Sequence, residues 1–110
     1  MADLEKQFDE AMMNVYRTAK DECGYNATYF LQMLHDKRGI ATAKHLLAAD
    51  GAQYGFEKLW DYGRLDITVE CLVLNPKFRS LFNEGELERA RERLRKYDFD
   101  PTRCERDRGG

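Results

Sequence analysis

Two histidines and three cysteines are the residues of this chain that most readily bind metals or act as nucleophiles. Zinc sites use cysteines and histidines roughly two to five residues apart, and no such spacing exists among His35, His45, Cys23, Cys71 and Cys104. Cys23 and Cys71 fall on apolar faces of expected helices, where a small hydrophobic side chain packs well. The sequence therefore predicts no metal site, no cofactor and no disulfide scaffold.

Glu70 is an acidic residue beside an apolar helical face, and a buried acid in such a place is a candidate catalytic group. The neighbouring charges favour a structural interpretation, in which Asp66 caps a helix and Arg64 pairs with an acid of the same cluster. The chain has no glycine-rich phosphate loop, no serine-hydrolase motif and no zinc-protease motif. We therefore predict that the protein is not an enzyme, and catalysis by Glu70 or a histidine is the least favoured alternative.

A basic stripe on the last expected helix consists of Arg89, Arg93 and Lys96. Such a stripe could clamp phosphates or an acidic partner. Four glutamates share that helix, and interleaved charges more often form a solvated, self-paired surface. Nucleic-acid binding through this stripe is therefore an alternative to the favoured function.

Aromatic residues are dense between positions 54 and 62, and they include Tyr54, Trp60 and Tyr62. One core cannot take every ring of so short a segment. Tryptophan and tyrosine that a core leaves exposed are typical of protein-binding hot spots. The sequence predicts a protein interface formed by these three residues and Arg64, and the alternative is that each ring is merely half buried.

Helices must position these side chains, because apolar residues recur at steps of three and four along most of the chain. Glycines and the Asn75-Pro76 pair divide the pattern into segments. Asn26 and Asp66 are expected N-caps, and Asn83 forms a capping box with Glu86. We predict helices over residues 3–22, 26–37, 40–49, 52–62, 66–74 and 83–97.

Residues 67–74 are rich in β-branched and apolar side chains, so a strand is the alternative structure there. A helix is favoured because Leu65, Val69, Leu72 and Val73 would share one helical face. An isolated strand would also have no partner elsewhere in the chain.

The length of 110 residues fits one domain, since burial becomes inefficient below roughly 60 residues. We predict a helical domain over residues 1–97 and a charged, flexible tail over residues 98–110, whose Gly109-Gly110 end has no assigned role. The net charge is −2 and no apolar run is long enough for a membrane span. Acidic residues near the start do not fit a signal peptide, so we expect a cytoplasmic protein that does not act at a membrane.

Several short motifs resemble a family of small helical bacterial proteins that are catalogued as hypothetical. The motifs are residues 24–27 (GYNA), 30–33 (FLQM), 55–56 (GF), 59–60 (LW), 63–66 (GRLD), 68–70 (TVE), and Phe78 with Leu81 and Phe82. The resemblance covers roughly residues 3–97 and implies a stand-alone bacterial or mobile-element domain. It assigns no activity to any residue.

The sequence thus predicts a compact all-α bundle of about five to six short helices in a single domain. Its favoured function is to bind another macromolecule, above all a protein, because the chain is small and has no catalytic motif. One alternative is a phage or mobile-element inhibitor of a host or defence enzyme, in the manner of anti-CRISPR proteins. The other is a nucleic-acid-binding accessory protein that uses the last helix.

Overall fold

The computed structural model describes residues 2–49 and 56–105, and every regular element in these ranges is helical. The prediction of an all-α domain is confirmed, and residues 69–74 form a helix and not a strand. The α-helices are α1 (Ala2–Cys23), α2 (Thr28–Ala48), α3 (Phe56–Asp61), α4 (Val69–Leu74), α5 (Glu84–Lys96) and α6 (Thr102–Glu105). Two short 3-10 helices, η1 (Leu65–Ile67) and η2 (Arg79–Leu81), flank α4.

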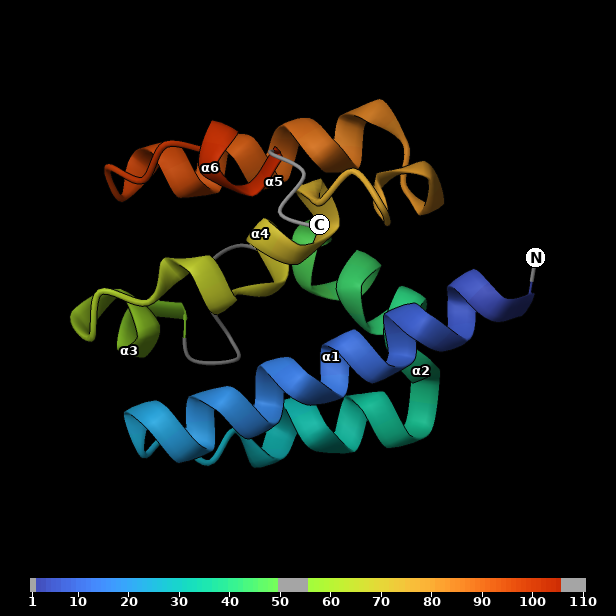
Figure 1. The fold of residues 1–110 in the computed structure, drawn as a ribbon, viewed down its shortest axis with the longest axis horizontal. Helices are drawn as coiled ribbons and strands as arrows, with labels where there is room; N and C mark the ends of the chain where they lie inside the picture. The colour runs from blue at the N-terminus through green and yellow to red at the C-terminus, as the bar shows by residue number, and fades with distance from the viewer. Residues whose placement is uncertain (1, 50–55, 106–110) are drawn as a thin grey trace.

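The helices form two layers around one core (Figure 1). Helix α1 and the first half of α2 lie side by side in one layer, α5 and α6 form the other, and α4 lies between them. The inward face of α1 is the predicted one, with Phe8, Met12 and Val15 buried. The ring of Phe8 contacts Phe78 and Phe82 edge-on, with centroid distances of 5.2 and 5.4 Å. The core is thus continuous from α1 to the turn before α5.

Helix α2 changes direction at Arg38, whose φ of 71° and ψ of 177° are not helical. The sequence predicted two helices separated at Gly39, so the break is confirmed within one residue. After the break, the second half of α2 runs back toward the centre of the molecule (Figure 1). We expected Asn26 to cap this helix, but it does not. Its Oδ1 instead accepts a hydrogen bond of 2.6 Å from the Tyr16 hydroxyl.

The start of α4 is also capped differently from the prediction. Thr68 is the N-cap, and its Oγ1 accepts a hydrogen bond of 3.2 Å from the Cys71 amide. Asp66 lies in η1, where its carboxylate binds Arg64, so the expected pairing of Arg64 with a nearby acid is confirmed. The capping box that starts α5 is confirmed, since Asn83 and Glu86 each bind the other's amide.

Residues 98–105 are not the flexible tail that the charged composition suggested. Pro101 and Cys104 are buried, and a disulfide joins Cys104 to Cys71 of α4. Cys71 was expected to pack as a small hydrophobic side chain and no disulfide scaffold was predicted, so the prediction is wrong for this pair, while Cys23 is a free, buried cysteine as expected. Gly109 and Gly110 lie outside the described residues. Within the described residues, no helix has the length and apolarity needed to cross a membrane.

Candidate functional site

Trp60 and Tyr62 project from a short stretch of chain between a buried leucine and a capped helix end. Leu59 anchors α3 in the core. Gly63, with a φ of 69°, closes the helix. Its amide donates to the Trp60 carbonyl over 2.9 Å and the Arg64 amide donates to the Leu59 carbonyl over 2.8 Å. This pair of bonds is the Schellman pattern, in which a left-handed glycine satisfies the last carbonyls of a helix.

Both aromatic side chains are about half exposed, Trp60 at 48% and Tyr62 at 52%. The Trp60 ring packs edge-on against Tyr97, with a centroid distance of 5.4 Å. The Lys58 ammonium lies 5.7 Å from the centre of the Tyr62 ring. Helix α3 and the last turn of α5 lie at the same end of the molecule (Figure 1). We use the name Trp60 surface for Trp60 and Tyr97, whose rings are in contact, together with Tyr62, two residues further along the same segment.

Arg64, the charged member of the predicted interface, fastens the Trp60 surface to two neighbouring elements. Its Nε donates to Asp66 Oδ1 over 3.1 Å, and its Nη1 binds Glu22 at the end of α1. Asp66 and then Glu22 raise the pKa of the Arg64 guanidinium, because nearby anions favour its charged form. Tyr54, the remaining member of the prediction, lies outside the described residues.

The structure brings Arg89 and Arg93 of the predicted basic stripe to the C-terminal end of α2. Arg89 Nε donates to the Leu47 carbonyl over 2.6 Å. Arg93 donates to the Leu46 and Ala49 carbonyls over 3.0 and 2.6 Å. These carbonyls belong to the last turn of α2 and its C-cap Ala49, where a helix has acceptors without internal partners. Both guanidinium groups therefore satisfy the end of another helix.

Glu70 and Arg93 form a buried ion pair, with 2.7 Å between Glu70 Oε2 and Arg93 Nη1. The Glu70 side chain is fully buried and the Arg93 side chain is 12% exposed. Such a pair must be well hydrogen-bonded to offset its desolvation, and the α2 carbonyls supply further acceptors for Arg93. Lys96, the third member of the stripe, is exposed on the last turn of α5.

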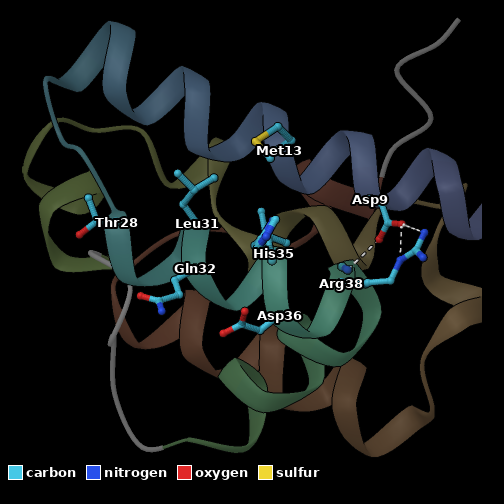
Figure 2. A pocket seen from close by; sticks show the side chains of 10 residues that line it. Asp9, Met13, Thr28, Leu31, Gln32, His35, Asp36 and Arg38 are labelled. Carbon is cyan, nitrogen blue, oxygen red and sulfur yellow. Dashed lines mark hydrogen bonds and ion pairs between the residues drawn. The ribbon is translucent and has the colours of Figure 1, made fainter.

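A cavity of about 760 Å³ lies between α1 and the first half of α2 (Figure 2). Met13 and Leu31 supply its apolar wall, and the exposed side chains of His35 and Asp36 stand at its rim. The Asp9 carboxylate at one end accepts from the Gly39 amide over 2.7 Å and from Arg38 Nη2 over 3.0 Å. Because these bonds engage both carboxylate oxygens, Asp9 acts as a structural group there.

The histidines occupy different faces of the same kinked helix. His35 reaches the rim of the cavity, whereas His45 is exposed in the second half of α2. Among the described residues, no three side chains of the histidine, cysteine, aspartate and glutamate types are placed to hold one metal ion.

The positions of two aromatic side chains carried no local signal in the sequence. The apolar spacing of the last expected helix gave no indication that the Tyr97 ring packs beside Trp60. Tyr29 is 54% exposed on α2 and was not singled out. Both positions depend on how distant elements pack.

Comparisons with models of protein families, with curated proteins and with solved structures found no match to this chain.

Proposed function

We propose that the protein is a protein-binding module and that its partner docks on the Trp60 surface. The observation that carries this proposal is the pair of half-exposed rings, Trp60 and Tyr62, on one short segment that ends in a hydrogen-bonded helix cap. Tryptophan and tyrosine dominate the binding energy of protein interfaces. Rings held by a fixed backbone also lose little conformational entropy when they bind.

Charged side chains lie next to the two rings, as expected at the edge of a protein interface. Lys58 lies over the Tyr62 ring, and the ion pairs of Arg64 with Glu22 and Asp66 border the same segment. Interfaces combine aromatic anchors with a polar rim that excludes water from them. A partner that covers both rings would bury the apolar part of this surface and leave the charges at its edge.

The experiment is a pull-down from lysate with Trp60→Ala and Tyr62→Ala compared with the unchanged chain. We expect each variant to lose partner affinity about 30-fold, equivalent to about 2 kcal/mol, as hot-spot residues do. Tyr29→Ala is the matched control, since it removes an equally exposed ring from α2 and should retain the partner. Circular dichroism must show that all three variants keep their helices. Full retention by both ring variants would contradict the proposal.

Trp60 is the only tryptophan of the chain, so its fluorescence reports directly on this surface. A partner that buries the ring should shift the emission to shorter wavelength. A captured protein that leaves the emission unchanged binds elsewhere.

The identity of the captured partner tests the narrower alternatives. A partner enzyme that loses activity on binding would make the module an inhibitor, as expected for a phage or mobile-element protein. Binding of nucleic acid that falls steeply with salt concentration would favour the basic stripe instead. The double variant Arg89→Ala with Lys96→Ala should then retain less nucleic acid than the unchanged chain.

A further inference from the structure

Apart from the peptide backbone, a disulfide fastens α6 and the turn before it to the body of the domain. The disulfide joins Cys104 of α6 to Cys71 of α4 across 33 residues of sequence. We propose that this disulfide is a redox-controlled latch: when oxidised it holds residues 98–105 in place and supports the Trp60 surface, and when reduced it releases both. This inference rests on the proposed function of the Trp60 surface.

Besides the disulfide, non-covalent contacts hold α6. A four-residue helix cannot sustain itself in water, because helix nucleation is unfavourable. Glu105 forms ion pairs with Arg91 and Arg79 over 3.2 and 3.8 Å, and such non-covalent pairs open and close without a bond being broken. Pro101 adds a buried ring. The disulfide is therefore the contact whose loss most favours release of the segment.

The same segment leads directly to the Trp60 surface. The chain turns at Asp98, with a φ of 61°, and the Phe99 amide donates to the Leu94 carbonyl over 3.0 Å. The Arg103 guanidinium of α6 lies 4.5 Å from the centre of the Phe99 ring. Tyr97, which supports Trp60, immediately precedes this turn. Release of α6 would remove Arg103 from Phe99 and free the chain next to Tyr97.

Both cysteines line a cavity of about 160 Å³, whose wall includes Ile67, Leu72 and Asn75. The two cysteines are nevertheless buried, at 7% and 5% exposure, so a reductant reaches the disulfide when the short α6 opens. Disulfides in a cytoplasmic protein, which the sequence predicts, are usually transient or redox-sensing. Opening of α6 and a reducing compartment together favour a reversible bond.

The chemistry requires a dithiol as reductant. Its thiolate attacks one sulfur atom of the disulfide, which gives a mixed disulfide and releases the other cysteine as a thiolate that takes up a proton. The second thiol of the reductant then displaces the first cysteine, which leaves as a thiol. Two electrons and two protons pass to Cys71 and Cys104, and the dithiol becomes a disulfide. Exchange with an oxidised dithiol reverses the step.

Limited trypsin digestion of the full chain, with and without dithiothreitol, tests the latch. In the reduced protein we expect cleavage after Arg103 to be about tenfold faster or more, because local opening governs proteolysis of a folded chain. The helical signal in circular dichroism should change little. Equal cleavage rates in the two states would overturn the proposal, as would three free thiols in the protein after air oxidation.

Cysteine variants provide matched controls. Cys23→Ser keeps both latch residues and should retain the full response to dithiothreitol. Cys104→Ser should be cleaved quickly in both conditions. If Cys104→Ser fails to fold, the comparison between reduced and oxidised unchanged protein still decides the question.

Partner capture separates this inference from the proposed function. About tenfold weaker retention by the reduced bait supports control of the Trp60 surface by the latch. Equal retention in both states, together with loss of the partner by Trp60→Ala, overturns the control and leaves the proposed function standing. Retention that Trp60→Ala does not affect overturns the proposed function, and the digestion result then decides the latch alone.

Discussion

The two ends of the second half of α2, residues 39–48, are held by charges of opposite sign from opposite layers. At the start, the carboxylate of Asp9 in α1 accepts a hydrogen bond from the Gly39 amide and forms an ion pair with Arg38. At the finish, Arg93 of α5 donates to the last carbonyls and binds Glu70. An anion at the first turn and a cation at the last turn both match the helix dipole.

The difference between these ends is burial. At the Asp9 end, the side chains of Arg38 and Asp9 are 78% and 27% exposed. At the Arg93 end, the corresponding values for Arg93 and Glu70 are 12% and 0%. Water can replace a lost partner at the first end but not at the second. The ion pair should therefore contribute little to stability at the Asp9 end and much more at the Arg93 end.

The largest effect should follow Arg93→Met, which removes a cation from a buried glutamate. We expect a loss of about 3–5 kcal/mol in the free energy of unfolding, because breaking a buried pair leaves its charge poorly compensated. Urea unfolding followed by circular dichroism measures it. The double variant Arg93→Met with Glu70→Gln should recover part of the loss. A cost below about 1 kcal/mol for the single variant, the range of exposed pairs, would remove the contrast.

Gly39→Ala tests the close approach at the other end. A Cβ atom there would lie 2.7 Å from Asp9 Oδ1 and 3.2 Å from Asp9 Cα, so we expect a loss of about 1–3 kcal/mol from overpacking. Thermal unfolding provides the measurement. Gly85→Ala is the matched control, since its Cβ meets only Asn83 Oδ1, at 3.3 Å. Equal effects of the two substitutions would show that α1 and α2 are not held closely at Asp9.

The N-terminal end of α5 is an intermediate case that a pH titration can sharpen. Burial raises the pKa of Glu86, but the Asn83 amide and the Lys44 ammonium lower it by more, so it lies below the usual 4.5. The unfolded chain therefore binds a proton more readily near that pH. The contribution of Glu86 to stability is complete above pH 4.5 and is lost as the pH falls through the lowered pKa.

Glu86→Gln should accordingly cost about 0.5–1 kcal/mol at pH 7, the range of partly exposed pairs. The difference from the unchanged protein should vanish in acid, as measured by urea unfolding between pH 7 and pH 2. Glu84→Gln is the control, because this side chain is 81% exposed and should have little effect at any pH. A difference that stays constant down to pH 2 would contradict the assignment.

Local patterns predicted the elements of this fold well. The three-and-four spacing of apolar residues located α1 and α5, and Asn83 with Glu86 marked the start of α5. Gly39 marked the break in α2. Each of these signals comes from residues within a few positions of one another, and helix formation and capping depend on such neighbours.

The contacts between distant segments could not be predicted in the same way. The sequence singled out Glu70 as a possible catalytic acid and Arg93 as a possible phosphate ligand, yet their pairing depends on the packing of α4 against α5. The rule that a buried acid needs a cation would have directed attention to an arginine, but not to this one. Cys104 stood among charged residues near Pro101, so composition suggested a tail and concealed its bond to Cys71.

The break at Arg38 also governs how α2 tolerates changes in length. A straight helix of 21 residues would extend about 31 Å, roughly the full width of a molecule that measures 35 × 30 × 29 Å. The bend lets the two halves of one helix pack in different directions, and no loop separates them that could accommodate an added residue. One residue inserted after the break would rotate the remaining turns by about 100°. Leu46 and Leu47 would then leave the core, so the chain does not tolerate an insertion at the Arg38 kink.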